Sequence, residues 1–506
     1  MKRGTRPKRA TKWPLVLLLA AFLLGCGALP GSLRGGSGHW QHLQTEHFDL
    51  ITDLTDADAE TSARALELNR DALLTTAWSK AAGSRRTARA SVVVFGNGLE
   101  FERYAGPGYE GIFTRYGRPT FFLWGTPDRW EKRWLRDEAT TSVLRHEMAH
   151  RLAAAIYGRQ PRWFSEGLAQ FLEALVIAED GSSATLGRPN MAALRKYKAF
   201  RSVSVRDALD WRSDEDKDER TISGLYGLSW MMVHWLYNTQ FQAFAAYQER
   251  LGEGISPDEA WSNSFGSFDL DEIDKKLFEY SRFGEFKELN VKLDPVETHS
   301  VSMQVTAADI HAIHAQFGLA TSGLRGKESS KDEARADIER ALALEPANVL
   351  ALRLRQGLDD KLPEAEVRRR LEEQVRRRPN DGEAWLLLGE MLRGDANAAE
   401  REVALRRAVA LLPGEASANN NLAWLLVSSG RGEEALPLAM KAAMLAPWDA
   451  AVIDTHAAAL FALGRCTDAL RVQRRAIDLI PEQLRRTKGA RVYIETLRKY
   501  QSACGP

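Results

Sequence analysis

Residues 143–167 read VLRHEMAHRLAAAIYGRQPRWFSEG and contain the pattern that organises the N-terminal half of the chain. No proline interrupts residues 129–158, and their composition favours a helix. His146 and His150 are four positions apart, about 400° of helical rotation, so both lie on one helical face and can share a metal ion. Glu147 is offset from His146 by about 100° and lies near such an ion, where it can accept a proton from water.

A second helical segment, predicted over residues 163–177, contains a third candidate ligand. Glu166 follows His150 by sixteen residues, and the turn from Gly158 to Pro161 allows the chain to return antiparallel. Two histidines and one carboxylate leave the fourth position of tetrahedral zinc open to water, which is typical of catalytic zinc sites. Two simpler interpretations stay open: the histidines are surface polar groups, or Glu166 is an ordinary acid in a first helical turn.

These motifs resemble those of the gluzincin metallopeptidases, most closely the bacterial peptidase MA-like group. In that group H-E-x-x-H is followed by a short turn and an aromatic–x–Ser–Glu–Gly segment, here Trp163 to Gly167. The resemblance covers about residues 40–290. It implies an α+β zincin-like catalytic domain with a mixed sheet, an active-site helix and a helical subdomain. It also implies peptide-bond hydrolysis with one zinc ion, the base Glu147, and the ligands His146, His150 and Glu166.

The resemblance further implies a donor for the oxyanion. Gluzincins often use a tyrosine from a later helix, and Tyr226 is the candidate here, with His234 as an alternative donor. Tyr226 can equally be an aromatic core residue, and a histidine among apolar neighbours is commonly structural. Two positions depart from the family pattern: Arg151 is charged, and Gln170 stands where some gluzincins have an acid that orients a histidine. Such outer contacts tune ligand basicity, so both departures bear on activity.

Other segments predict the elements around this motif. Strands are expected at 47–52 and 91–95, a hairpin at 113–124, and helices at 57–77, 226–238, 242–251 and 270–280. The strand from Phe121 to Trp124 is either a sheet edge that pairs with an extended peptide or an ordinary core strand. The charged run 211–220 predicts a solvated loop, and residues 282–305 predict a linker with some strand character.

The C-terminal part repeats with a fixed period. Prolines at 346, 379, 413, 447 and 481 are 33 or 34 residues apart, and alanines at 408, 442 and 476 keep the same step. This pattern resembles tetratricopeptide repeats, most clearly over residues 381–481, and implies an all-α solenoid. A generic helical array has the same physics and is the alternative. Residues 484–500 predict the terminal capping helix that solenoids need.

The N-terminus predicts export. Six basic residues in positions 1–12 precede an apolar run over 13–24, which is too short for a comfortable membrane span. The run ends in Leu23-Leu24-Gly25-Cys26, which resembles the lipobox of bacterial lipoproteins and implies acylation of Cys26. Gly27, where an aspartate would favour retention in the inner membrane, indicates the outer membrane facing the periplasm. An ordinary signal peptide and a short uncleaved anchor are the alternatives.

Composition excludes several classes of protein. Lys+Arg 69 against Asp+Glu 68 gives +1, and removal of residues 1–25 would change it to −5, so no basic excess indicates a nucleic-acid partner. Three cysteines exclude a disulfide-dense scaffold and any C-x-x-C motif. Beyond Cys26, an oxidising compartment allows a disulfide between Cys466 and Cys504, although two free thiols fit the sequence equally well.

The predicted order along the chain is a signal peptide (1–25), a flexible tether (26–39), a gluzincin-like domain (40–290), a linker (291–305), a tetratricopeptide domain (306–482) and a capping helix (483–506). The favoured function is an exported, lipid-anchored zinc metallopeptidase of the bacterial cell envelope, acting on peptides or proteins, whose repeats bind substrate or protein partners. The alternatives are a catalytically inactive scaffold that works through its repeats and, third, a binding module with a structural zinc.

Overall fold

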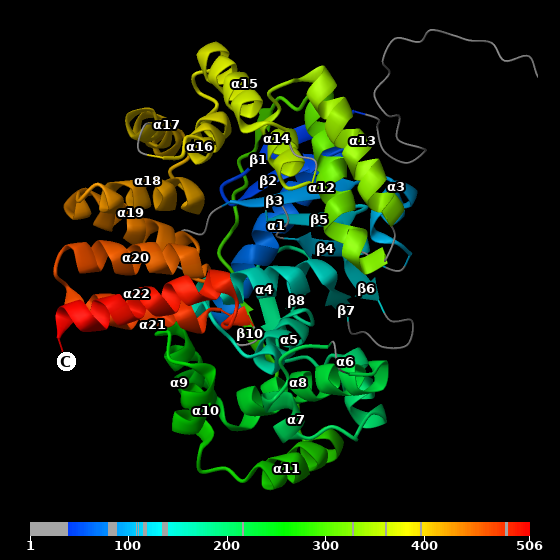
Figure 1. Ribbon diagram of the computed structural model, residues 1–506. Helices are drawn as coiled ribbons and strands as arrows, with labels where there is room; N and C mark the ends of the chain where they lie inside the picture. The colour runs from blue at the N-terminus through cyan, green and yellow to red at the C-terminus, as the bar shows by residue number, and fades with distance from the viewer. Residues whose placement is uncertain are drawn as a thin grey trace, which may run out of the picture. The chain divides into compact units, whose positions relative to one another are not determined.

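The computed structural model describes residues 39–78, 89–107, 109, 111–114, 119–133, 140–214, 217–325, 328–359, 362–394, 397–480 and 484–505 (Figure 1). The predicted signal peptide, Cys26 and Pro481 lie outside these ranges. None of the helices in the described ranges combines the length and apolar character that a membrane span requires.

A mixed six-stranded sheet in the described part of the chain organises the N-terminal region, in the order β11–β1–β2–β3–β5–β4 (Figure 1). β2, β3 and β5 are parallel to one another, and the other three strands run antiparallel to their neighbours. The prediction of an α+β N-terminal region with a mixed sheet is therefore confirmed. The sheet contains β1 (Gln41–Gln44), β2 (Phe48–Thr52), β3 (Ala90–Phe95), β4 (Gly111–Thr114), β5 (Thr120–Trp124) and β11 (Val301–Met303).

Helices and small ribbons connect and surround this sheet. The helices of the region are α1 (Asp56–Ala77), α3 (Gly98–Ala105), η1 (Pro127–Trp130), α4 (Val143–Tyr157), α5 (Arg162–Leu172), α6 (Met191–Ala199), α7 (Val205–Leu209), α8 (Glu219–Thr239), α9 (Phe241–Gly252), α10 (Pro257–Phe265) and α11 (Leu270–Phe283). The remaining strands are β6 (Glu131–Arg133), β7 (Thr140–Ser142), β8 (Val176–Ile177), β9 (Ser183–Leu186) and β10 (Leu289–Lys292).

The two faces of the sheet are covered by different parts of the chain. Along β3, Val92 and Val94 point into a core shared with α1, α4, α5 and α8. Val93 and Phe95 point into a second core with α3 and α12 (Ala307–Arg325), where Phe317 stacks on Phe122 of β5 at 4.1 Å between ring centroids. Burial on both faces explains why β3 is almost continuously apolar, as in parallel sheets generally.

The hairpin predicted at residues 113–124 is present as β4 and β5, and of the two interpretations left open for Phe121–Trp124, the structure shows the core strand and not the sheet edge. β5 pairs with β3 on one side and with β4 on the other, so its backbone hydrogen bonds are used on both sides. β4 is the outer strand of this side, and no described strand pairs with its free edge.

The helix that carries His146 and His150 is shorter than predicted. Residues 140–142 form β7, which pairs with β6, and α4 begins at Val143 with Ser142 as its N-cap. The residues upstream of Val143 are also good helix formers. The helix begins at Val143 because the Ser142 hydroxyl accepts a hydrogen bond from the Arg145 backbone N–H and so caps its first turn. α4 ends at Gly158, whose φ of 68° suits glycine. α5 also ends earlier than predicted, and residues 176–177 form β8.

The segment predicted as a linker is held at both ends by strands. β10 pairs with β9, and β11 pairs with β1 and extends the main sheet. The charged run 211–220 is likewise not uniformly solvated, because Trp211 is buried and its indole N–H donates to Asp214.

The C-terminal part is a series of paired helices, as the 34-residue period predicts (Figure 1). Ala408, Ala442 and Ala476 recur at equivalent positions and are fully buried where paired helices approach closely. The array consists of α12, α13 (Glu328–Leu344), α14 (Val349–Gln356), α15 (Glu364–Arg377), α16 (Gly382–Met391), α17 (Ala398–Leu411), α18 (Ala416–Ser428), α19 (Gly432–Leu445), α20 (Ala450–Ala462), α21 (Cys466–Asp478) and α22 (Lys488–Cys504).

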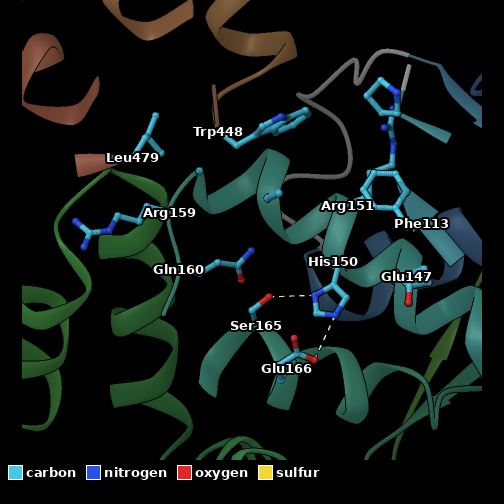
Figure 2. A pocket seen from close by; sticks show the side chains of 13 residues that line it. Phe113, Glu147, His150, Arg151, Arg159, Gln160, Ser165, Glu166, Trp448 and Leu479 are labelled. Atoms are coloured by element: carbon cyan, nitrogen blue, oxygen red, sulfur yellow. Dashed lines mark hydrogen bonds and ion pairs between the residues drawn. The ribbon is translucent and has the colours of Figure 1, made fainter. Parts of the chain in front are cut away.

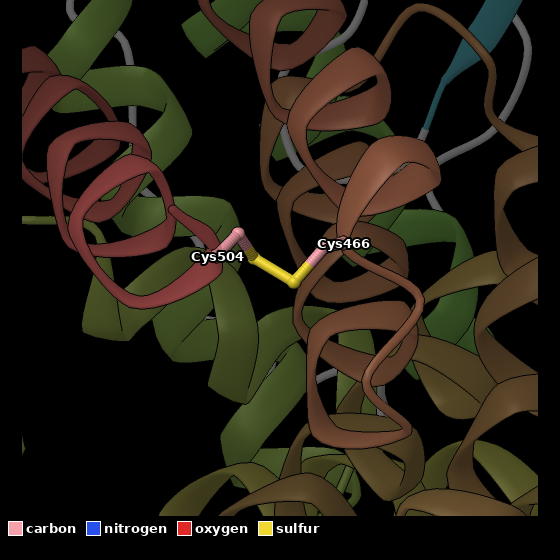
Figure 3. Close-up of a disulfide and its surroundings, with 2 residues drawn as sticks. All are labelled: Cys466 and Cys504. Carbon is pink, nitrogen blue, oxygen red and sulfur yellow. A yellow bond between two sulfur atoms is a disulfide. The ribbon is translucent and has the colours of Figure 1, made fainter. Parts of the chain in front are cut away.

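A disulfide ties the end of this array together. Cys466 is the first residue of α21 and Cys504 the last of α22, and their sulfur atoms are bonded (Figure 3). The packing of α22 on α20 is also aromatic, with Tyr500 stacked on Phe461 at 4.1 Å. The terminal helix is therefore attached both covalently and through its apolar face.

Candidate metal centre

The structure brings His146, His150 and Glu166 together from two helices. His146 and His150 project from one face of α4, and Glu166 lies in the first turns of α5, which returns after the Gly158 turn. The Nε2 atoms of the two histidines are 3.2 Å apart, and Glu166 Oε2 lies 3.8 Å from His146 Nε2 and 3.5 Å from His150 Nε2. Tetrahedral zinc with bonds of about 2.0–2.1 Å holds its donor atoms about 3.3 Å apart. The three donor atoms thus fit one zinc ion.

An acid that the sequence analysis did not identify orients His146. The Nδ1 atom of His146 lies 2.6 Å from Glu173 Oε2, and Asn190 Nδ2 donates to the other oxygen of Glu173 at 2.5 Å. A carboxylate only accepts, so His146 carries a proton on Nδ1, and Nε2 is the ring atom that faces Glu166 and can bind a metal ion once its own proton has left. Carboxylate–histidine pairs of this kind accompany metal-binding histidines. Glu173 is seven residues after Glu166, two turns along α5, and this spacing was the signal available in the sequence.

The second histidine is oriented in the same way by a hydroxyl. His150 Nδ1 lies 3.0 Å from Ser165 Oγ, and its Nε2 faces Glu166 (Figure 2). Ser165 immediately precedes Glu166 in α5, so one helical turn supplies both a ligand and the partner of another ligand. This geometry explains why Ser165 and Glu166 are adjacent in the sequence motif: one contacts Nδ1 of His150 and the other faces its Nε2.

The electrostatics of the site favour a charged ligand cluster. Burial raises the pKa of Glu166, but its hydrogen bond and charge interaction with His150 outweigh burial and leave that pKa below the ordinary value. Burial lowers the pKa of His146, but the Glu173 carboxylate outweighs it and raises that pKa to about 9. A metal ion must therefore displace a firmly held proton from His146, and metal binding releases protons.

Glu147 lines the adjacent cavity together with His150 and Glu166 (Figure 2), and it follows His146 directly in α4. Burial raises the pKa of Glu147, and the neighbouring histidines only partly offset this effect. A carboxylate with a raised pKa is a better proton acceptor near neutral pH than an exposed one. The position and environment of Glu147 suit a general base.

Gln170 and Arg151, the two departures from the family pattern, do not disturb the ligands. Gln170 Nε2 donates to the Tyr226 carbonyl at 3.0 Å and so connects α5 to α8. The task of orienting a histidine falls to Glu173 instead. Arg151 lines the cavity, and one of its nitrogens donates to the Arg89 carbonyl at 3.3 Å.

The two candidate oxyanion donors have different surroundings. Tyr226 is half-buried on α8 against Trp211, at 5.1 Å between ring centroids, and the nearby Arg162 guanidinium acts to lower the pKa of its hydroxyl. Burial raises the pKa of Tyr226, and the charge of nearby Glu166 raises it further. Tyr226 is not among the described residues that line the cavity. Its role as an oxyanion donor therefore stays a prediction.

His234 is a structural residue. It is fully buried, its Nε2–H donates to the Gly187 carbonyl at 3.0 Å, and its Nδ1 lies 2.9 Å from the Tyr280 hydroxyl. Both ring nitrogens are therefore used within the core. Burial lowers the pKa of His234 to about 4, so the ring is neutral at neutral pH.

A cavity of about 570 Å³ opens next to the ligands (Figure 2). One face of α4 forms its floor from Glu147 to Gly158, a length of roughly 16 Å at 1.5 Å per residue. The walls come from the β4–β5 hairpin, from α5 with the turn before it, and from two residues of the repeat array. The wall residues are Phe113, Pro119, Arg159, Gln160, Ser165, Glu166, Trp448 and Leu479.

Two family models match separate parts of the chain. Residues 140–256, which include the three ligand residues, match a family described as a protein of unknown function (DUF1570). Residues 360–480 match a tetratricopeptide repeat model. No curated protein sequence matches the chain.

The chain is also similar, at low identity, to solved structures. TTC0263, a thermophilic tetratricopeptide protein of Thermus thermophilus, is 20% identical with a TM-score of 0.29, over 37% of this chain and 99% of that chain. YrrB, described as a tetratricopeptide protein with an unusual peptide-binding site, is 19% identical with a TM-score of 0.26, over 36% and 91%. Yeast Tom70 is 13% identical with a TM-score of 0.29, over 70% and 69%. The match to residues 360–480, taken with the paired helices, identifies the C-terminal part of the chain as a tetratricopeptide repeat array.

Proposed function

We propose that this protein is a zinc-dependent peptidase with a zincin-like catalytic domain. The observation that carries the proposal is the ligand geometry: three donor atoms at 3.2–3.8 Å, with both histidines turned toward Glu166 by hydrogen bonds at Nδ1. Three protein ligands leave one position of a tetrahedral ion open, the pattern of catalytic rather than structural zinc. The resemblance to gluzincins in sequence agrees with this arrangement.

A bound zinc ion would supply Lewis acidity at the open position, polarising a carbonyl and acidifying water. Glu147 then accepts the proton of the attacking water and delivers it to the leaving amine. Glu173 keeps a proton on Nδ1 of His146, and Ser165 orients the His150 ring, so that both histidines present Nε2. Arg162 and the Tyr226 hydroxyl are the candidates for stabilising negative charge on the carbonyl oxygen, because each interacts electrostatically with Glu166.

The shape of the cavity supports a polypeptide as substrate. Its floor of roughly 16 Å accommodates about five extended residues at 3.3 Å each. Phe113 of β4 lines the cavity, and no described strand pairs with the outer edge of β4. An extended peptide can add to such an edge as a further strand, so that main-chain hydrogen bonds hold it across the ligands.

The remaining parts of the proposal concern location and partners. The lipobox-like segment ending at Cys26 supports export and a lipid anchor in the bacterial cell envelope. The repeat array supports binding of a protein partner, because paired helices form extended surfaces of this kind. The second candidate function, an inactive scaffold, has the repeat array in its favour. The intact base and ligand set favour the enzyme.

The decisive test compares wild type with Glu147→Gln. Metal content is measured after zinc loading, and cleavage is measured on casein and on an internally quenched peptide library. We expect one zinc per chain in both proteins, with cleavage only by wild type. Glu179→Gln, which neutralises an exposed glutamate, is the matched control and should cleave normally.

Two results would contradict the proposal. Zinc-loaded wild type that cleaves nothing spared by Glu147→Gln would favour the scaffold. Unchanged zinc affinity in Glu166→Ala would remove Glu166 from the ligand set.

A further inference from the structure

The last tetratricopeptide repeat forms part of the wall of the cavity beside the candidate metal centre. Trp448 lies in the turn between α19 and α20, and Leu479 follows α21. Both line the same cavity as Glu147, His150 and Glu166 (Figure 2). The repeat array is therefore continuous with the site of the proposed chemistry.

Close backbone and side-chain contacts hold this repeat against α4. A Cβ atom on Gly158 would lie only 3.0 Å from the Pro447 carbonyl oxygen, so the two turns touch. Arg159 Nη1 lies 3.6 Å from Asp478 Oδ1, one residue before Leu479. Arg475 of α21 packs on Gly254 in the turn after α9, 3.2 Å from where a Cβ would stand.

The first helix of the array is attached to the same region at a different place. α12 covers one face of the sheet through Phe317, and Gln316 Nε2 donates to Thr120 Oγ1 at 3.3 Å. Because contacts exist at both ends of the array, the last repeat is held in its place next to α4. Trp448 and Leu479 are thereby presented to the cavity by a supported element.

Both side chains are half-buried and have an apolar supporting layer behind them. Trp448 packs on a small cluster that contains Ala446 and Val452, and Leu479 packs on the cluster that contains Val472. A supported tryptophan and a supported leucine in the wall of one cavity give it apolar surface suited to an aliphatic or aromatic side chain.

The position along α4 indicates which substrate residue meets this surface. His150 and Gly158 are eight residues apart, roughly 12 Å along the helix axis. An extended peptide advances about 3.3 Å per residue, so this distance corresponds to three or four residues. A substrate side chain three or four residues from the scissile bond would therefore lie next to Trp448 and Leu479 of the last repeat.

We propose that the last tetratricopeptide repeat supplies an apolar substrate subsite, in which Trp448 and Leu479 bind an aliphatic or aromatic side chain three to four residues from the scissile bond. This inference rests on the proposed peptidase function. It makes the repeat array a specificity-determining part of the enzyme as well as a surface for partners.

The test compares Trp448→Ala with Trp424→Ala. Trp424 lies in α18 of the same array and is 44% exposed, so its removal is the matched control. Internally quenched decapeptides carry Leu, Phe, Ser or Gly at each position from two to five residues on either side of the cleaved bond. We expect Trp448→Ala to lower kcat/KM for Leu and Phe at one position by roughly tenfold or more, through KM, with little change for Ser and Gly.

A binding measurement separates this inference from the proposed activity. Fluorescein-labelled versions of the same peptides are titrated into zinc-loaded Glu147→Gln with and without Trp448→Ala. If Glu147→Gln binds Leu and Phe peptides more tightly than Ser and Gly peptides, and the double variant with Trp448→Ala does not, the subsite is supported even if wild type cleaves nothing. An unchanged preference in Trp448→Ala and in Leu479→Ala, in proteins with wild-type zinc content, overturns it. Trp448→Phe should retain the preference, which excludes a general folding defect as the cause.

Discussion

Gly167 offers a sharp test of how the two helices of the candidate site are held. It follows Glu166 in α5 and faces α8, where a Cβ atom would lie 2.3 Å from the Ser229 carbonyl oxygen and 2.9 Å from Val233 Cγ2. Ordinary contacts begin near 3.4 Å, so the Gly167→Ala variant fits only if the helices separate by about 1 Å. The obstructing atom belongs to the backbone and cannot rotate away.

Two opposing effects determine the expected magnitude. Replacing glycine with alanine inside a helix stabilises it by up to about 1 kcal/mol. Overpacking a filled interface costs about 1–3 kcal/mol, and the upper end applies to contact with backbone. We expect Gly167→Ala to lower the free energy of unfolding by about 2 kcal/mol. Zinc affinity should fall as well, because metal ligands tolerate displacements of about 0.2 Å and Glu166 is the adjacent residue.

Urea unfolding followed by circular dichroism measures the free energy, and competition with a chromogenic chelator measures zinc affinity. Gly489→Ala is the matched control, since Gly489 lies in α22 and an added Cβ atom there would have no neighbour within 4 Å. That variant should keep wild-type stability or gain up to about 1 kcal/mol. If Gly167→Ala is as stable as Gly489→Ala and binds zinc normally, the close packing of α5 on α8 is not what positions Glu166.

Three further predictions concern other parts of the molecule. Glu173→Gln should weaken zinc binding roughly tenfold to a hundredfold by releasing His146, and unchanged affinity would deny Glu173 its orienting role. Reduction of the Cys466–Cys504 disulfide, which spans 38 residues, should destabilise the last repeat by about 4 kcal/mol in urea unfolding; a double serine variant that unfolds like oxidised wild type would refute this. His234 has a pKa of about 4 when folded and about 6.5 when unfolded, so below pH 6.5 the unfolded state binds more protons and stability falls toward pH 4. In EDTA, the stability advantage of wild type over His234→Asn should therefore shrink by about 3 kcal/mol between pH 7.5 and pH 4, and a constant difference would contradict it.

The elements with local signals were predictable from the sequence. The 34-residue period identified the repeat array, and the spacing of His146, His150 and Glu166 identified residues that the structure brings to within bonding distance of one ion. Each of these signals depends on residues close together in the chain, or on exact repetition. Local helical periodicity is enough to place such residues on a common face.

The parts that sequence reasoning missed depend on contacts between distant segments. The sequence left open whether Phe121–Trp124 is an edge or an interior strand, because its composition does not distinguish the two, and only the pairing of β4 beside β5 makes it interior. Trp448 reaches the cavity from a turn almost 300 residues after His150, which no local pattern reveals. Glu173 was missed for a different reason: its spacing from Glu166 was readable, but the family pattern pointed to the position of Gln170 instead.

The pairing of β11 with β1 changes where this protein can be divided. A cut at residue 290 looks safe from the sequence, but it would remove an edge strand of the main sheet and, with α12, the cover of one sheet face. A fragment ending there would expose Phe122 and Phe95 to water and leave β1 with an open edge, two features that promote aggregation. A fragment of the N-terminal region therefore has to include β11 and α12, although both lie beyond the point where the sequence suggests a boundary.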